Sequence, residues 1–199
     1  MRRQIYGDIY DDSMWLIDLV ENLLSVTRIE EGRMQIRQSA ELVDEVIREA
    51  LKHTGQSRTG RTIKVEEEDE LILAKMDARL IVQVLINLIG NAVKYTPQGT
   101  DITVRVKKEK AENGENSQVI ISVCDLGDGI PDDRKERVFE MFYTGGDQVA
   151  DSRRSLGLGL GLCRSIINAH GGKIWISDNI PHGAVVTFTL PAEEVALNE

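Results

Sequence analysis

The stretch NLIGNAVKYTP, residues 87–97, carries polar side chains at a spacing that could do chemistry. Four of them fall at positions i, i+4, i+7 and i+8 and so share one face of an otherwise apolar helix: Asn87, Asn91, Lys94 and Tyr95. A buried amide is costly unless a partner satisfies it, and a single buried asparagine usually caps neighbouring backbone. Two amides followed by a lysine instead favour a ligand that carries phosphates and a hard cation, because asparagine oxygen suits Mg²⁺.

A second stretch, DLGDGIP at residues 125–131, directly follows an apolar strand pattern. The Asp125 carboxylate at the end of a strand is partly desolvated and needs a hydrogen-bond donor, for which the exocyclic amine of a purine would serve. Gly127 and Gly129 allow the backbone to pass close to a flat ring. An ordinary Asp-Gly turn is the alternative, and it is the commoner explanation when this stretch is taken alone.

The third stretch is SLGLGLGLCRSI, residues 155–166, in which glycine and leucine alternate. Glycine inside regular structure costs about 0.5–1 kcal/mol relative to alanine, so Gly157, Gly159 and Gly161 need a reason. Glycines before a helix let backbone N–H groups converge on an anion, and the helix dipole assists. A flexible linker would carry serine rather than leucine between its glycines. A dinucleotide fingerprint requires G-x-G-x-x-G after a first strand, whereas this spacing is G-x-G-x-G near the C-terminus.

The bulk composition limits the function classes that remain. In 199 residues, 41% are hydrophobic and only 5% aromatic, which predicts a globular protein with an aliphatic core. The net charge of -9 argues against nucleic acid and against an anionic membrane surface as partners. Cys124 and Cys163 have no metal-ligand spacing and are expected to be reduced core residues in the cytoplasm. No apolar run reaches transmembrane length, and the first 12 residues lack the apolar region of a signal peptide.

Hydrophobic periodicity predicts the elements that must position these stretches. Helices are predicted over 13–31, 40–53, 77–95, 131–139 and 160–170, and strands over 34–38, 62–65, 71–74, 102–106, 119–123, 173–177 and 184–190. The segment 143–156 is polar and contains glycine, so we expect a mobile loop. Helices and strands mix without strict alternation. The predicted fold class is therefore α+β: a two-layer α/β sandwich, with helices on one face of a mixed β-sheet, preceded by one long helix.

The predicted N-terminal helix carries apolar residues at three-four spacing, at Leu16, Leu19, Leu23 and Val26, and Val20 and Leu24 form a second stripe. Such a seam favours packing against other long helices, although an amphipathic helix lying on its own domain is the commoner arrangement. Because the chain opens without cap or turn chemistry, we expect it to begin partway through a larger protein. This predicts two parts, a hairpin remnant over 1–32 and a domain over 33–199.

Four motifs now stand in a characteristic order: NLIGNAVKYTP, DLGDGI, FEMFY and GLGLGL. They resemble the N, G1, F and G2 boxes of sensor histidine kinases, whose catalytic ATP-binding domain is shared with gyrase, Hsp90 and MutL. The resemblance covers residues 34–191. DSMWLIDLVENLLSVTRIEEG resembles the second helix of the dimerisation and phosphoacceptor hairpin. That helix and GLCRSIINAHGG are also similar to the potassium-sensing branch.

The resemblance implies a role for each matching residue. Asn91 would bind Mg²⁺, Asn87 and Lys94 would be catalytic and close to the phosphates of ATP, and Asp125 would accept a hydrogen bond from the adenine amine. The implied cofactor-binding set is Asn87, Asn91, Lys94, Tyr95, Asp125, Gly127, Gly129, Ile130, Phe142, Gly157, Leu158, Gly159, Leu160 and Gly161. Phe142 and Phe139 would anchor the lid over the nucleotide, although both could equally be simple core aromatics.

Several residues depart from the family's pattern. Leu158 stands where a threonine or another small residue is frequent, and Thr144 stands where a basic residue is frequent. Arg153 or Arg154 could supply the missing positive charge, although surface arginines are mostly just solvated. Ala184 replaces a frequent hydroxyl residue, which weakens any water-mediated contact to adenine.

The largest departure is the phosphoacceptor. The three histidines, His53, His170 and His182, all lack the family's His-acidic-x-x-x-Pro context. The sequence therefore predicts Mg-ATP binding and phosphoryl donation to a histidine on a helix that these 199 residues do not contain. The partners implied are that helix, a response regulator and no nucleic acid. The full-length protein would be a membrane-attached homodimer with this part in the cytoplasm, while the present chain could be a monomer or a dimer. An ATPase of the same fold and a non-catalytic scaffold are the alternatives.

Overall fold

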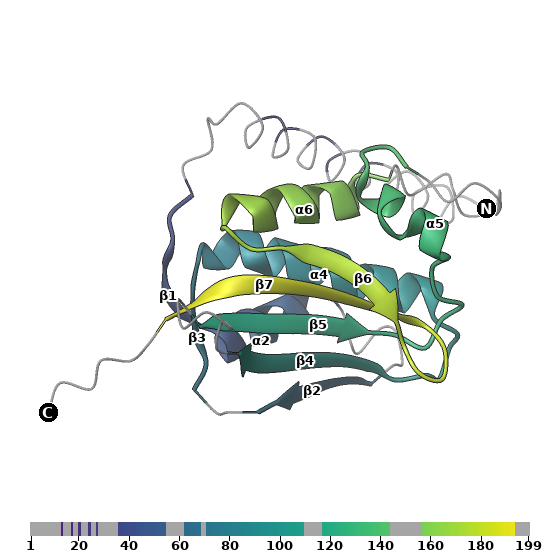
Figure 1. The fold of residues 1–199 in the computed structure, drawn as a ribbon, viewed down its shortest axis with the longest axis horizontal. Coiled ribbons are helices and arrows are strands. Elements are labelled where there is room, and N and C mark those ends of the chain that lie inside the picture. The colour runs from purple at the N-terminus through teal and green to yellow at the C-terminus, as the bar shows by residue number, and fades with distance from the viewer. Residues whose placement is uncertain are drawn as a thin grey trace, which may run out of the picture.

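The computed structural model describes residues 36–54, 62–68, 71–109, 117–143 and 157–193, together with five positions between 13 and 27. Its elements follow one another in the order shown in Figure 1. The strands are β1 (Ser39–Leu42), β2 (Ile63–Glu67), β3 (Leu73–Met76), β4 (Ile102–Glu109), β5 (Gln118–Cys124), β6 (Ile174–Asp178) and β7 (Ala184–Glu193). The helices are α2 (Val43–His53), α4 (Ala78–Tyr95), α5 (Asp132–Lys135) and α6 (Gly159–Ala169), with a 3-10 turn, η1 (Arg137–Phe139).

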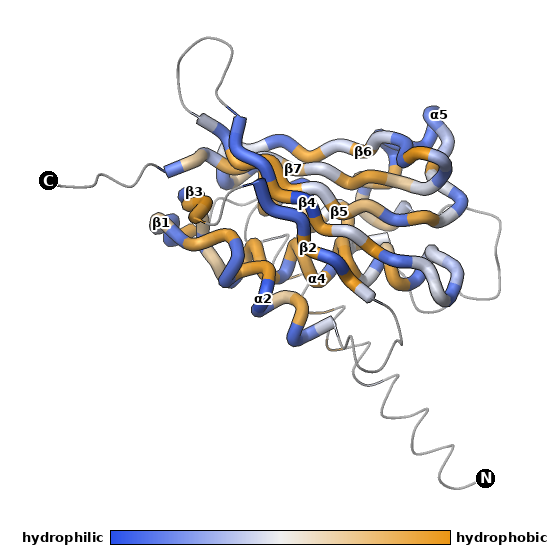
Figure 2. The backbone as a smooth tube through the Cα atoms, turned by 90° about the horizontal axis from the view of Figure 1, so that it is seen from below, coloured by the Kyte–Doolittle hydropathy of each residue, from blue (hydrophilic) through white to orange (hydrophobic). Residues whose placement is uncertain are grey.

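The strands form one seven-stranded mixed sheet in the order β1-β3-β7-β5-β4-β2, and β6 also pairs with β7. The β2–β4 pair is parallel, and all the other pairs are antiparallel. Figures 1 and 2 show α2 and α4 packed against one face of this sheet, and α6 lies beside α4. The predicted two-layer α/β sandwich is therefore confirmed.

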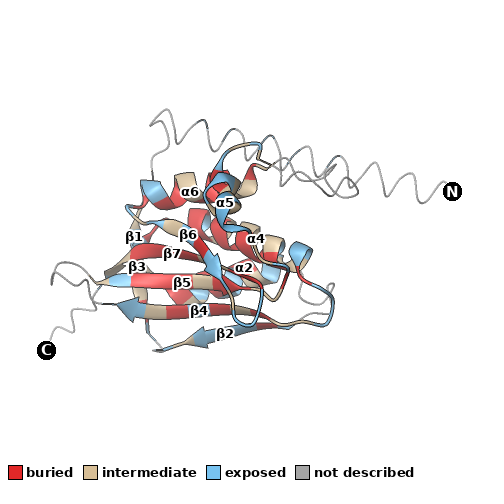
Figure 3. Cartoon of the chain, turned by 45° about the vertical axis from the view of Figure 1, so that its right-hand side comes forward, coloured by how far each residue is buried: buried red, intermediate tan, exposed pale blue. Residues whose placement is uncertain are grey.

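Alternation along the central strands explains this one-sided packing. Val104, Val123 and Val186 lie opposite one another across β4, β5 and β7, and the first two are buried against the helices. Figure 2 shows hydrophobic and hydrophilic residues alternating along these strands, whereas hydrophobic residues dominate α4. Figure 3 shows the buried residues concentrated where helices meet the sheet. Aliphatic side chains make up nearly all of this core, as the low aromatic content predicts.

The beginning of α4 is fixed by its cap. The Asp77 side chain accepts a hydrogen bond from the backbone N–H of Leu80, with 3.4 Å between Oδ1 and N, and this satisfies one of the free amides of the first turn. The helix ends at Tyr95 because Thr96 is extended and Pro97 follows it. The predicted helix over 77–95 is therefore confirmed almost residue for residue.

The first strand and helix differ from the prediction. Residues 36–38 of the predicted strand 34–38 are not in a strand, and residues 40–42 of the predicted helix belong to β1. The reason is a long-range pairing, since Ser39 lies opposite Met76 of β3 and the Val43 N–H bonds to the Ile72 carbonyl oxygen. The predicted helix 131–139 is likewise divided into α5 and η1.

The N-terminal helix is described at Ser13, Ile17, Val20, Leu24 and Thr27, all helical and exposed. The three apolar side chains among them are each about half exposed. They include both members of the predicted second stripe, whereas the seam at Leu16, Leu19, Leu23 and Val26 lies outside the described residues. Among the described residues, no helix has the length and apolar character that crossing a membrane requires.

Candidate nucleotide-binding site

The predicted polar face of α4 is present. Asn87 and Asn91 are half-buried, while Lys94 and Tyr95 at the end of the helix are exposed. The Lys94 ammonium lies 5.2 Å from the centroid of the Tyr95 ring. With a rise of 1.5 Å per residue, the eight steps from Asn87 to Tyr95 span about 12 Å. The amides and the lysine therefore form a strip along two turns of one helix.

Asn87 meets the glycine-rich stretch at one end of this strip. A Cβ atom at Gly159 would lie 3.9 Å from Cγ of Asn87, so the amide stands against the first turn of α6. Its Nδ2 atom is buried and has no hydrogen-bond partner in the described part of the chain. The neighbouring Cys163 thiol interacts with this amide, but sulfur is a weak acceptor. A buried unpaired donor beside a helix N-terminus, with no side-chain cap on that helix, suits an anion.

The Cys163 thiol is free and buried in the core. Burial raises its pKa to about 12, so the thiol stays protonated at neutral pH. Cys124 is also buried, and burial raises its pKa as well. Both cysteines are free core residues, as predicted from their sequence context.

The glycine-rich stretch begins with a tight contact. Gly157 has a φ of +66°, and a Cβ there would lie 2.3 Å from the carbonyl oxygen of Tyr143. The Phe142 N–H donates to the Gly157 carbonyl oxygen at an N–O distance of 3.1 Å. Phe142 and Tyr143 therefore lie beside Gly157, although Gly157 is far from them in the sequence. The segment 144–156, which includes Thr144, Arg153 and Arg154, lies outside the described residues.

The remaining residues of this stretch pack inward. Leu158 is buried, and Leu160 packs against both hydrophobic clusters. A Cβ at Gly161 would come within 3.3 Å of the Phe139 carbonyl oxygen. The leucine side chains are thus used for packing, and any contact that Leu158 or Leu160 makes with a ligand would come from backbone.

The two predicted lid phenylalanines differ sharply. Phe139 is buried in a small cluster with Ile176 and Ala184, and Ile130 packs against this cluster. Phe142, in contrast, is 60% exposed and has a φ of +64°. Phe139 is therefore a core aromatic, whereas Phe142 combines an exposed ring with a backbone conformation that side-chain-bearing residues rarely adopt.

Asp125 lies at the other end of the strip. Its Oδ1 atom accepts hydrogen bonds from the N–H groups of Gly127, at 2.9 Å, and of Ala184, at 3.1 Å. A Cβ at Gly127 would lie 2.6 Å from the Tyr95 carbonyl oxygen, so the loop rests directly on the end of α4. Gly129 has a φ of +76°, which favours glycine. The carboxylate is held by two backbone donors, and its second oxygen is left to accept from a ligand.

Sequence reasoning missed two residues of this site. Asn179 donates from Nδ2 to the Asp125 carbonyl oxygen at 2.7 Å, and His182 Nδ1 lies 3.2 Å from the Gly127 carbonyl oxygen. Both belong to the turn between β6 and β7. Their spacing from Asp125 in the sequence gives no periodic signal, and only the pairing of β5 with β7 brings them together.

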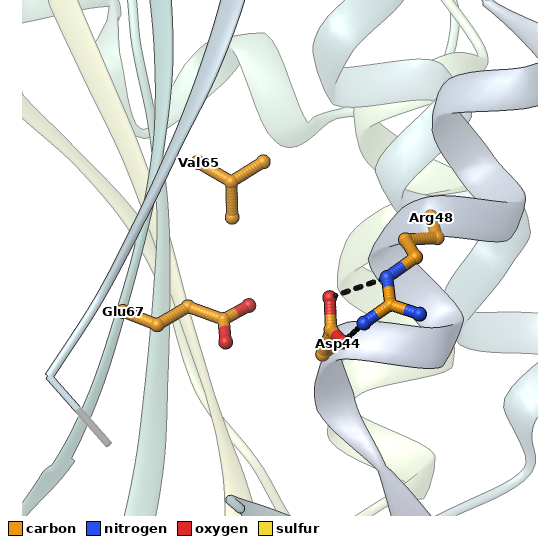
Figure 4. A pocket seen from close by; sticks show the side chains of 4 residues that line it. All are labelled: Asp44, Arg48, Val65 and Glu67. Atoms are coloured by element: carbon orange, nitrogen blue, oxygen red, sulfur yellow. Dashed lines mark hydrogen bonds and ion pairs between the residues drawn. The ribbon is translucent and has the colours of Figure 1, made fainter. Parts of the chain in front are cut away.

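None of the predicted site residues lines the cavity drawn in Figure 4. It measures about 500 Å³ and lies between α2 and β2, lined by Asp44, Arg48, Val65 and Glu67. Arg48 Nε donates to Asp44 Oδ1 at 3.0 Å, and Glu67 faces this ion pair. Burial, followed by the nearby Asp44 charge, raises the pKa of Glu67. Its buried Oε1 atom has no partner within the described residues.

The described residues contain no group of three or more histidine, cysteine or acidic side chains that could hold a metal ion. A metal bound along the α4 strip could instead use amide oxygen and oxygens of the ligand itself. Mg²⁺ accepts such an arrangement because it usually keeps several waters and takes one or two protein oxygens beside phosphate.

Comparisons with known proteins identify the family of the chain. Residues 76–194 match the family described as histidine kinase-, DNA gyrase B-, and HSP90-like ATPase. The chain is 40% identical over 192 residues to the sensor protein KdpD of Clostridium acetobutylicum, covering 96% of this chain but 21% of KdpD. It thus spans about a fifth of that relative's length. The KdpD relative supports the placement with the potassium-sensing branch.

Two solved histidine kinases share the fold. Full-length ShkA in complex with AMPPNP matches with a TM-score of 0.76 at 22% identity, over 96% of this chain and 39% of ShkA. ThkA in complex with the response regulator TrrA matches with a TM-score of 0.67 at 28% identity, over 89% of this chain and 49% of ThkA. The chain therefore belongs to the family of histidine kinase-, DNA gyrase B- and HSP90-like ATPases, and its relatives within it are sensor histidine kinases.

Proposed function

We propose that this chain is the Mg-ATP-binding catalytic domain of a two-component sensor histidine kinase. The observation that carries the proposal is the strip along α4. At one end, the unpaired Asn87 donor stands beside the first turn of α6 and suits phosphate. At the other end, the Asp125 carboxylate keeps one oxygen for an amine. ATP carries phosphates at one end and the amine of its base at the other.

Each residue along the strip has a role in this proposal. Asn91 holds Mg²⁺ through its amide oxygen, and the bound ion supplies charge neutralisation at the phosphates. Asn87 donates to a phosphate oxygen, and Lys94 adds a positive charge one turn beyond Asn91. The amides of Gly159, Leu160 and Gly161 face the same anion. Phosphoryl transfer depends mostly on such positioning and charge neutralisation.

The acceptor in the proposed reaction is a histidine from the phosphoacceptor helix of the full-length protein. An imidazole nitrogen forms a bond to the γ-phosphorus, the bond from that phosphorus to the bridging oxygen breaks, and ADP leaves. His170 is not this acceptor, because both of its ring nitrogens lie within hydrogen-bonding distance of backbone groups in the core. We place the acceptor outside these 199 residues and propose onward transfer to a response regulator. The whole protein would be a membrane-attached homodimer with this part in the cytoplasm.

An ATPase of the same fold is the second candidate. That branch of the family places a glutamate base where Asn87 stands, and an amide cannot accept a proton from water. A non-catalytic scaffold is less favoured, because Asn91, Asp125 and the three glycines at 157, 159 and 161 are all intact.

Two measurements test the proposal. Calorimetry with AMPPNP and Mg²⁺ should show binding to one site, and no binding at millimolar nucleotide would favour the scaffold. In the second measurement, the phosphoacceptor hairpin of the Clostridium acetobutylicum KdpD is added with γ-labelled ATP. We expect label on the hairpin and none on this chain. Phosphate released into solution at the same rate with or without the hairpin would favour the ATPase.

A further inference from the structure

The turn between β6 and β7 is hydrogen-bonded to the loop that carries Asp125. Asn179 closes the turn, since its backbone N–H donates to the Gly183 carbonyl oxygen at 3.0 Å. Its side chain then reaches out of the turn, and Nδ2 donates to the Asp125 carbonyl oxygen at 2.7 Å. The side-chain oxygen of Asn179 accepts from the Ile180 N–H at 3.0 Å. Both ends of this amide are therefore engaged, which fixes its orientation.

The backbone of Asp125 is consequently held from both sides. Its N–H donates to the Ala184 carbonyl oxygen at 2.9 Å, and its carbonyl oxygen accepts from Asn179. The carboxylate is turned so that Oδ1 faces the N–H groups of Gly127 and Ala184. Oδ1 already accepts from two backbone donors. Among the described residues none donates to Oδ2, so this second oxygen can accept from a ligand.

The contact between the turn and the loop leaves no spare room. A Cβ at Gly183 would lie 2.1 Å from the Asp125 carbonyl oxygen, and a Cβ at Gly129 would lie 3.2 Å from the Gly183 carbonyl oxygen. Gly183 has a φ of +112°, which side-chain-bearing residues rarely adopt. Backbone packs directly on backbone here, so the loop that carries Asp125 cannot move closer to the β6–β7 turn. The Asn179 hydrogen bond therefore holds this loop at a fixed distance from the turn.

We propose that Asn179 is a positioning residue that sets the base selectivity of the nucleotide site. The inference rests on the proposed ATP binding. A carboxylate with one open oxygen accepts one N–H, as the 6-amino group of adenine offers. The guanine edge presents two adjacent donors, N1–H and the 2-amino group, and full pairing with them needs both carboxylate oxygens. A 6-oxo purine such as hypoxanthine places an acceptor opposite the carboxylate, which is repulsive.

The test compares wild type with Asn179→Asp, in which a carboxylate oxygen replaces the donating amide without changing the size of the side chain. Calorimetry measures the dissociation constants of Mg-ATP, Mg-ITP and Mg-GTP for each protein. We expect wild type to bind ATP more tightly than the other two. In the variant, the preference for ATP over ITP should fall by roughly 3–10-fold, as expected for one misplaced hydrogen bond. Asn179→Ala should change the ratio in the same direction.

Ile180→Ala is the matched control, because this side chain of the same turn is 91% exposed and should leave the ratio unchanged. A purely structural role for Asn179 would weaken all three nucleotides equally or lower only the melting temperature, and either result would overturn the inference. If wild type binds ATP with the expected preference but the variants keep it, the inference alone fails. If wild type binds none of the three nucleotides, the proposed function fails as well. Should both variants misfold, a wild type that binds GTP as tightly as ATP would still refute the inference about Asn179.

Discussion

The Nε2 atom of His170 accepts a hydrogen bond from the backbone N–H of Asp77, with 3.0 Å between the two nitrogens. The other ring nitrogen, Nδ1, lies 2.7 Å from the Ile166 carbonyl oxygen and donates to it, which makes the ring neutral. Asp77 caps the beginning of α4, and His170 follows the end of α6. This buried ring therefore joins the two helices that carry the amide strip and the glycine-rich turn.

The stability of the domain should depend on pH through His170. Burial, the largest effect, lowers the pKa of His170 in the folded state below its usual 6.5. Between these two values the unfolded chain binds more protons than the folded one, so the free energy of unfolding falls as the pH drops below 6.5. Above 6.5 the ring is neutral in both states and no stability is lost. Urea unfolding at pH 7.5 and 5.5 measures this effect.

His170→Gln separates titration from hydrogen bonding, because the glutamine side chain offers an acceptor near the Nε2 position but does not ionise. We expect a smaller difference between the two pH values in this variant than in wild type. His53→Gln, at an exposed histidine of α2, is the matched control and should behave as wild type. An unchanged pH dependence in His170→Gln would show that other groups produce it.

Glu67 should be a residue whose charge destabilises the fold. Because burial raises its pKa in the folded state, its contribution is most favourable at low pH and is lost as the pH rises through that raised pKa. Glu67→Gln should therefore stabilise the protein at pH 7 by less than ~1 kcal/mol, since solvent screens this partly exposed group. The gain should vanish near pH 4. Urea unfolding checks both values, with the exposed Glu45→Gln on α2 as control, and a destabilised variant at pH 7 would contradict the prediction.

The left-handed conformation of Phe142 predicts an unusual order of stability. At most positions alanine is more stable than glycine, but at a φ of +64° the Cβ atom costs about 1 kcal/mol. We therefore expect Phe142→Gly to be more stable than Phe142→Ala by about 1 kcal/mol, since both remove the same exposed ring. Thermal unfolding of the pair measures the difference. The same two substitutions at Lys52, exposed in α2, should give the opposite order, and the same order at both positions would refute the assigned backbone strain.

The sequence allowed prediction of those parts of the fold that depend on local periodicity. The α4 helix is apolar nearly all round and carries its own cap, so its bounds follow from the pattern. The α6 helix begins one residue earlier than predicted, at Gly159, because the glycine amide already belongs to the first turn. The four ordered motifs also identified the strip along α4 and the Asp125 loop. These motifs are contiguous stretches, and their residue types limit the chemistry they can do.

Pairing between distant segments could not be predicted in the same way. Residues 40–42 satisfy the helical pattern of 40–53, but hydrogen bonding to β3 makes them a strand. The Asn179 side chain contacts a carbonyl 54 residues away, across a sheet whose strand order no local pattern specifies. The positive φ of Phe142 likewise accompanies a hydrogen bond to the distant Gly157, which no local pattern specifies.

The assignment of Mg²⁺ to Asn91 makes a prediction that depends on the metal itself. Asn91→Ala removes the amide oxygen but leaves the Asn87 donor and the amides of α6 in place. Binding of ATP with Mg²⁺ should weaken roughly tenfold or more, as expected for a lost interaction with a charged group. Binding with EDTA in place of Mg²⁺ should change by less than about twofold, because the phosphates then meet only the donors that remain.

Calorimetry under the two conditions gives both ratios from one protein preparation. Gly90→Ala is the control variant, because Gly90 is exposed, precedes Asn91 and has nothing within 4 Å of an added Cβ. It should bind ATP as wild type does under both conditions, and the helix should gain up to about 1 kcal/mol of stability. Equal losses with and without Mg²⁺ in Asn91→Ala would mean that Asn91 contacts the nucleotide or supports α4 rather than the metal. The dependence on Mg²⁺, and not the loss of affinity alone, therefore identifies the role of Asn91.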